Sequence, residues 1–275
     1  MPAWHAHPDV WALLGGVWVL YLVTVRRHAP SAPVEARERG RRTAMFSVGM
    51  AVLLVASSYP VHDLAEERLY SVHMVQHMLY TLVAAPLLVA GIPGWMWRRL
   101  LRPAAVRSAF GLLTKPVVAI AVFNGLLLFT HWPQVVDASV RSEGTHFALH
   151  ALTLGSAIVM WWPVLSPLPE LPSLTPPAQM LYLFANSLAP TIPASFLTFG
   201  STLLYPVYGT FPRLWGIPAL TDQLVAGLIM KIVGGLVLWG FIAVIFFNWH
   251  ARERGGWDAL ALRGVEREVR TGLAK

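Results

Sequence analysis

The stretch LYSVHMVQHMLYTLVAAPLLVAG, residues 69–91, decides the fold. It runs for 23 residues without a charged side chain. The hydrocarbon core of a bilayer is crossed by about 20 apolar residues of helix, so this stretch predicts a membrane-spanning helix. It also carries two histidines, His73 and His77. Ionisable residues inside spans are rare and normally face a functional interior.

Six further apolar runs accompany this one. Together they predict seven spans, at about 9–25, 43–59, 69–91, 116–132, 145–163, 178–200 and 224–249. The breaks between them are charged or rich in proline, which cannot continue a helix. We therefore expect an all-α polytopic membrane protein in which residues 1–275 form one seven-helix bundle, with a cytoplasmic tail at 250–275.

The composition agrees with a lipid environment. Only 13% of the 275 residues are charged and 56% are hydrophobic, whereas soluble domains carry about 25% charged residues. The chain has no cysteine, which excludes disulfides, thiolate metal sites and thiol nucleophiles. The net charge of +7 does not indicate nucleic-acid binding, because the basic residues form short clusters between apolar runs.

These basic clusters predict the orientation of the bundle. Of the 20 Lys and Arg residues outside the spans, 17 lie in 26–42, 92–115 and the segment after 250. Only Arg68, Arg141 and Arg213 lie in the alternate segments. By the positive-inside rule the N-terminus is outside and the C-terminus cytoplasmic. The first span has basic residues after it rather than before it, the reverse of a cleavable signal peptide, so we expect it to remain.

The histidines gather on the predicted outer side. Six of the ten lie there at helix ends: His62, His73, His77, His131, His146 and His150. His73 with His77, and His146 with His150, form two H-x-x-x-H pairs at the starts of spans. Four residues of helix turn through about 400°, so both rings of a pair share one face, as chelation of one ion requires. These four residues are the primary candidate ligands.

Four other residues are second candidates. His62 and His131 end the spans that precede the two pairs, and we expect them at the mouth of the cavity, where they receive the ion or hydrogen-bond its ligands. Asp222 and Met230 belong to the seventh span. Each has an ordinary alternative: Asp222 as a helix cap and Met230 as a packing residue. Gln76 shares a face with the first pair and is an expected hydrogen-bond partner.

Lys231 is the only base inside a span. A charged, unpaired lysine there costs about 2.5–3.5 kcal/mol. We therefore expect its ammonium group to face the bundle interior near the histidines, either snorkelling outward or pairing with Asp222.

Imidazole ligands suit copper, zinc and iron, and thioethers favour Cu(I). Met74, Met78 and Met230 add thioethers at a depth similar to that of the histidines. Copper, which is handled on the outer side of a bacterial membrane, is therefore the expected ion, with zinc as the alternative. Haem is disfavoured. Two haems stacked between the same helices need histidines separated by most of the membrane along one helix, whereas the two histidine pairs lie at one depth.

Several of these residues occur in motifs of a known family. The runs HDLA at 62–65, SVHMVQHML at 71–79, APLLVAGIP at 85–93 and DQLVAGLIM at 222–230, together with THW at 130–132 and WWP at 161–163, resemble the CtaG family of cytochrome c oxidase assembly proteins. The resemblance covers about residues 44–249. Lys231 departs from the family pattern, which has an apolar or aromatic residue there.

The resemblance implies a multi-pass protein of the bacterial cytoplasmic membrane that matures a haem-copper oxidase. It implies a metallochaperone rather than an enzyme, which passes copper to an oxidase subunit or to a periplasmic copper carrier. Two alternatives stay open. One is an intramembrane zinc hydrolase with Asp222 or Asp63 as base and a lipid amide as substrate. The other is a b-type haem protein. The oligomeric state stays open as well.

Overall fold

The computed structural model describes residues 6–28 and 33–273. It is 81% helical, and the described residues form no strand. The elements in chain order are α1 (Pro8–Arg27), α2 (Pro33–Ala56), α3 (Val61–Glu67), α4 (Tyr70–Met78), η1 (Leu79–Ala84), α5 (Ala85–Gly91), α6 (Gly94–Leu100), α7 (Ala104–Leu113), α8 (Pro116–Thr130), α9 (Pro133–Arg141), α10 (Glu143–Leu165), α11 (Pro176–Leu188), α12 (Thr191–Phe199), α13 (Pro206–Gly209), α14 (Ala219–Leu228), η2 (Ile229–Val233) and α15 (Gly234–Leu273). The two η elements are π-helical turns.

The membrane-spanning helices follow the predicted runs. Five helices of the described chain are long and apolar enough to cross a bilayer, and two bent helix pairs raise the number to seven. The fourth predicted span is the shortest, because α8 has 15 residues, or about 22 Å of helix. It reaches the required length only together with α7, from which it is bent by 80°.

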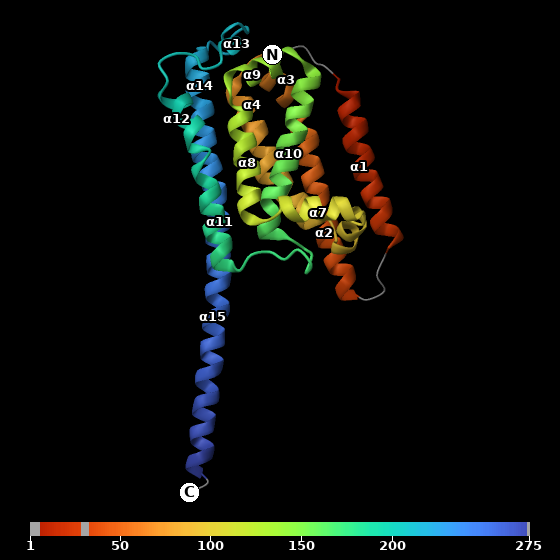
Figure 1. The fold of residues 1–275 in the computed structure, drawn as a ribbon, viewed down its shortest axis with the longest axis vertical. Helices are drawn as coiled ribbons and strands as arrows, with labels where there is room; N and C mark the ends of the chain where they lie inside the picture. The colour runs from red at the N-terminus through yellow and green to blue at the C-terminus, as the bar shows by residue number, and fades with distance from the viewer. Residues whose placement is uncertain (1–5, 29–32, 274–275) are drawn as a thin grey trace.

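The helices form a bundle with two distinct ends (Figure 1). The short helices α3, α9 and α13 lie at one end, which we call the histidine end, and α15 extends far beyond the other end. Helix α1 stands at the side of the bundle, where it packs mainly on α2. Inside the bundle, α10 packs against α8 and α5, and α14 packs against α4 and α12. The histidine-bearing helices are therefore surrounded by other spans.

Proline explains the irregular turn in the third span. Pro86 has no backbone N–H, and the π-helical turn η1 ends two residues before it. In a π-helix the carbonyl of residue i pairs with the N–H of residue i+5, so Pro86 leaves the carbonyl of Thr81 without its partner. The indole N–H of Trp161 on α10 donates to that carbonyl at 2.7 Å. The buried Trp161 thus gives the Thr81 carbonyl the hydrogen bond that Pro86 cannot donate.

Two glycines let spans approach closely. A Cβ on Gly91 of α5 would lie 2.5 Å from the backbone nitrogen of Phe46 on α2. A Cβ on Gly227 of α14 would lie 2.5 Å from the hydroxyl of Thr198 on α12. Small residues at helix contacts are the usual means of close packing inside membranes. These contacts fix α5 and α14. Helix α4 leads into α5 through η1 and packs against α14, so its position depends on both.

The sixth span is interrupted near Pro190 and Pro193, since α11 ends at Leu188 and α12 begins at Thr191. Two details differ from the sequence-based expectation. The segment 250–273 is part of the single helix α15 rather than a separate tail. The amphipathic helix α9, between the fourth and fifth spans, is not apparent from hydropathy because it contains only nine residues.

Candidate metal centre

Three histidines from two spans meet inside the histidine end. His73 and His77 project from α4, and His150 projects from α10. One nitrogen of each ring lies within 4.8 Å of one nitrogen of the others. The ring centroids of His73 and His77 are 4.4 Å apart, and that of His150 lies 5.5 and 5.2 Å from them. We call these three residues the imidazole site.

The polar atoms of the imidazole site lack protein partners. Nδ1 of His73, Nε2 of His77 and Nε2 of His150 are buried and make no hydrogen bond within the described part of the chain. Nε2 of the neighbouring His146 is in the same condition. A buried polar group without a partner costs about 1–3 kcal/mol, and native proteins contain few of them. A group of such nitrogens at one place therefore fits a site that binds a ligand.

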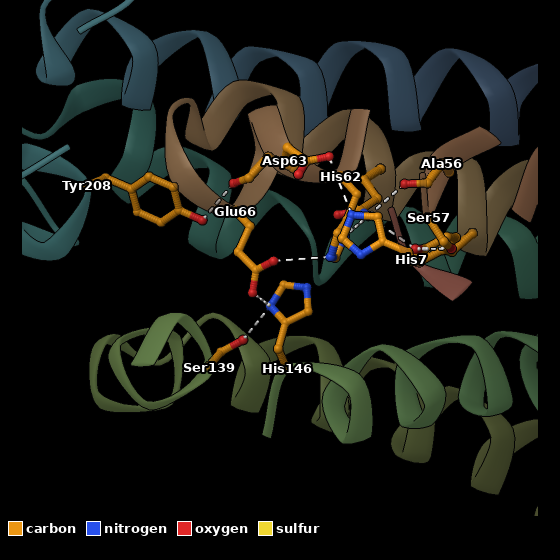
Figure 2. Close-up of polar contacts among 12 residues, drawn as sticks. His7, Ala56, Ser57, His62, Asp63, Glu66, Ser139, His146 and Tyr208 are labelled. Atoms are coloured by element: carbon orange, nitrogen blue, oxygen red, sulfur yellow. Dashed lines mark hydrogen bonds and ion pairs between the residues drawn. The ribbon is translucent and has the colours of Figure 1, made fainter. Parts of the chain in front are cut away.

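A second group of donors lies beside the first and includes a carboxylate. It consists of His62 and Glu66 on α3 and His146 on α10, with one donor atom of each residue within 4.8 Å of the others. Nε2 of His62 is 3.1 Å from one oxygen of Glu66, and Nδ1 of His146 is 3.7 Å from the other oxygen. Figure 2 shows the Glu66 side chain reaching from α3 toward both rings. We call this group the carboxylate site.

The two sites are connected through α10. His146 and His150 belong to different sites, yet their ring centroids are only 4.1 Å apart because one turn of helix separates them. The predicted pair therefore exists as a pair of adjacent rings, but each member faces a different set of donors. The sequence predicted one site of four histidines, but the structure has two adjacent groups of three residues. The pair on α4, His73 and His77, stays together in one of these groups.

Gln76 orients a ring of the carboxylate site. Its side-chain amide lies 3.2 Å from Nδ1 of His62, and the same amide nitrogen donates to the Ala56 carbonyl at 2.7 Å. With Nδ1 accepting from this amide, Nε2 of His62 faces Glu66. Gln76 is fully buried. It is the hydrogen-bond partner predicted from the sequence, but it serves His62 rather than the pair on its own helix.

Asp222 holds the start of α4 in place. One carboxylate oxygen accepts from the backbone N–H of Tyr70 at 2.7 Å, and the other accepts from the N–H and the hydroxyl of Ser71. A carboxylate at a helix N-terminus satisfies free N–H groups and interacts favourably with the helix dipole. Asp222 thus has the capping role that was the alternative to metal binding. The helix that it caps is α4 and not its own helix α14. It belongs to neither donor group of the described residues.

Methionines line an apolar cavity behind the imidazole site. This cavity, of about 50 Å³, is bordered by Met74, Met230, His77 and His131 among others. Met74 and Met230 are almost completely buried. The carbonyl of Leu127 lies 2.7 Å from Nδ1 of His131, and the His131 ring centroid is 6.1 Å from that of His77. His131 therefore lies on the far side of His77, whereas His62 borders the open pocket described below.

Lys231 does not pair with Asp222. The carboxylate oxygens of Asp222 face the start of α4, while Lys231 lies in the π-helical turn η2, about two and a half turns farther along the chain. Its side chain is exposed on the bundle surface and also borders the cavity that contains His77 and Met230. Lys231 therefore borders the histidine cavity, but the expectation that it faces the bundle interior is not met, and the pairing with Asp222, one of the two expected arrangements, is wrong.

An open pocket gives access to the carboxylate site. It has a volume of about 610 Å³ and is lined by α1, α3 and α10 residues that include His7, Asp63 and Glu143. Nε2 of His7 is 3.4 Å from an oxygen of Asp63, and its ring lies 4.8 Å from that of His62. His5 lies outside the described residues. Neither the place of Glu66 beside His62 nor that of His7 beside Asp63 was predicted from the sequence.

Comparisons with known proteins place this arrangement in a family. Neither the curated proteins nor the solved structures gave a significant match. The family model described as cytochrome c oxidase caa3 assembly factor, Caa3_CtaG, matches residues 19–252. The matched region extends from α1 into α15 and contains both donor groups. The chain therefore belongs to the Caa3_CtaG family of cytochrome c oxidase caa3 assembly factors.

Proposed function

We propose that this chain binds a copper ion at the imidazole site and supplies it to a cytochrome c oxidase during assembly. The observation that carries the proposal is the group of buried ring nitrogens of His73, His77 and His150 that have no hydrogen-bond partner. A metal ion would use these lone pairs and remove the cost of burying them unpaired. Family membership supports an oxidase as the recipient.

The surroundings of the site favour copper over zinc. Neutral imidazoles bind both metals, but thioethers favour Cu(I). Met74 and Met230 are buried beside His77 on the wall of the same cavity. An ion at the imidazole site would therefore have soft sulfur donors within the neighbouring cavity. His131 borders this cavity too and is a further candidate donor.

The proposed location is the bacterial cytoplasmic membrane, with the histidine end facing outward. The clusters of basic residues at the opposite ends of the spans support this orientation. An outward-facing site would meet an oxidase subunit or a periplasmic copper carrier directly. We propose a transfer role without catalysis, because supplying an ion requires only an exchange of ligands.

Copper titration of the full-length protein tests the proposal. The metal-free chain, purified in detergent, is titrated with Cu(I) against a chromophoric chelator. We expect one tightly bound ion per chain, and an affinity that falls at least 100-fold in His77→Ala and His150→Ala. His250→Ala is the matched control, because it removes an imidazole from α15 outside both donor groups. A wild-type chain that competes no better than these variants contradicts the proposal.

A cell-based measurement tests the delivery step. Cells that carry only the His77→Ala chain should make the oxidase polypeptides but lack a copper-loaded oxidase, and the His250→Ala chain should restore it. Protein that retains zinc through purification and hydrolyses an amide substrate would instead support the zinc hydrolase. A Soret band in the isolated protein would support the haem alternative.

A further inference from the structure

The carboxylate site has the geometry of a metal site of its own. Zinc and similar ions bind nitrogen and oxygen ligands at about 2.0–2.2 Å, so two ligands of a tetrahedral ion lie about 3.3 Å apart. The two separations in this site are 3.1 Å, between His62 and Glu66, and 3.7 Å, between Glu66 and His146. The donor atoms of His62 and His146 lie within 4.8 Å of each other, so these two side chains would have to draw together for all three residues to bind one ion.

The side chains of this site are held in position by neighbours. Ser139 on α9 lies 3.2 Å from Nδ1 of His146, and Gln76 lies 3.2 Å from Nδ1 of His62 (Figure 2 shows the first contact). The Gln76 contact leaves Nε2 of His62 free to face the ion. Nδ1 of His146 is also the nitrogen near Glu66, so it would exchange the Ser139 contact for the ion. The side chain of His146 is only 5% exposed, and its Nε2 has no partner in the described chain. The contact with Gln76 and the burial of His146 therefore hold these two rings in position beside Glu66.

The donor set differs chemically from that of the imidazole site. A carboxylate is a hard ligand that favours divalent ions over Cu(I), while imidazole accepts both. Two histidines and one glutamate are also a set found in zinc sites with an open fourth position. The carboxylate would neutralise part of the charge of a divalent ion, which allows a second ion to bind nearby. The two groups share no residue.

The position of the site favours capture of cations from solution. Glu66 borders the open pocket, which is also lined by Asp9, Asp63 and Glu143. Carboxylates around a recess raise the local concentration of cations. His150 borders the same pocket, so the imidazole site lies directly behind the carboxylate site.

From this geometry we infer that His62, Glu66 and His146 form a second metal site, selective for divalent first-row cations such as Zn²⁺ or Cu²⁺ and separate from the imidazole site. The inference does not rest on the copper-delivery function, because it depends only on the geometry and donor chemistry of these three residues. The pocket supplies the path by which such an ion arrives.

Metal stoichiometry of the purified full-length chain tests the inference. Equilibrium dialysis against Zn²⁺ should give two ions per wild-type chain and one per chain in Glu66→Gln and in His62→Ala. Glu67→Gln is the matched control, because this neighbour lies in the same pocket but belongs to neither donor group. It should retain two ions. Cu²⁺ used in place of Zn²⁺ distinguishes the two divalent ions as occupants.

A parallel titration with Cu(I) separates the two sites. Glu66→Gln should keep the wild-type Cu(I) affinity, which also shows that the variant is folded, whereas His77→Ala should lose Cu(I) and keep one zinc ion. Glu66→Gln with two zinc ions per chain overturns the inference. Loss of both zinc ions and Cu(I) in Glu66→Gln also overturns it, because the donors would then form a single site. Failure of Cu(I) binding in the wild type, with two zinc ions retained, would refute only the copper function.

Discussion

Asp222 accepts a hydrogen bond from the backbone N–H of Tyr70 at 2.7 Å, although 152 residues separate the two in the chain. The bond joins α14 to the first turn of α4, just before His73. Helix α14, which begins the last span, therefore helps to set the position of α4, the helix that carries His73 and His77. Since Asp222 is 2% exposed, its charge is stabilised by these N–H groups rather than by water.

Substitution of Asp222 separates a capping role from a ligand role. Asp222→Ala should lower the stability by about 1–3 kcal/mol, because buried N–H groups lose a charged partner. Asp222→Asn keeps one acceptor and should give an intermediate melting temperature with near wild-type copper affinity. Thermal unfolding and copper titration in the same detergent check this. Thr221→Ala, at an exposed neighbour, is the control. An Asn variant that keeps its stability but loses copper would make Asp222 a ligand.

Gly91 should tolerate no side chain. In Gly91→Ala the new Cβ meets the backbone of Phe46, which cannot rotate away, so the expected loss is about 1–3 kcal/mol. Gly125→Ala on α8 is the matched control, because nothing lies within 4 Å of a Cβ there. Thermal unfolding of the two variants should differ clearly. Equal melting temperatures would mean that α2 and α5 can separate without cost.

Trp161 and Pro86 should show energetic coupling. Trp161→Phe removes the N–H that serves the Thr81 carbonyl, at a cost of about 1–3 kcal/mol. Pro86→Ala restores a backbone N–H that can serve the same carbonyl, so Trp161→Phe should cost less in the Pro86→Ala background. A double-mutant cycle from denaturation in mixed micelles measures the difference. Additive effects would show that the indole hydrogen bond does not compensate for the proline.

The orientation of the bundle can be measured with reporter fusions. A fusion after Lys275 should be active in the cytoplasm, because 17 of the 20 Lys and Arg residues outside the spans lie on that side of the seven-span arrangement. A reporter inserted in the segment between α12 and α14 should be active outside. Activity of the C-terminal fusion only in the periplasm would reverse the orientation and place both candidate metal sites on the cytoplasmic side.

The sequence predicted those features that depend on local periodicity. Apolar runs located the spans, and the spacing of four residues correctly placed His73 beside His77 and His146 beside His150. In both cases the helix itself brings the residues together. The division of the four histidines between two sites was not predictable in this way, because it depends on how α4, α10 and α3 are rotated against one another.

Contacts between distant segments were not predictable from local pattern. Glu66 lies in the charged segment EER at 66–68, which has the composition of a solvated loop. Only the tertiary fold brings its carboxylate to His146, 80 residues later. The helix capped by Asp222 was unpredictable for the same reason. The turn η1 has a visible cause in Pro86, but a proline in a span is equally compatible with a kink or a break.

The π-helical turn η1 gives the third span one residue more than a continuous α-helix of the same rise would hold. Since each residue of an α-helix turns through about 100°, one surplus residue rotates everything after it by that angle. His73 and His77 can thus face α10 while Gly91, at the other end of the same span, lies against α2. The direction in which the half with His73 and His77 faces is thereby offset from the direction in which the half with Gly91 faces. Deletion of a single residue between 79 and 84 would keep the hydrophobic length of the span and leave no rotation that satisfies both halves.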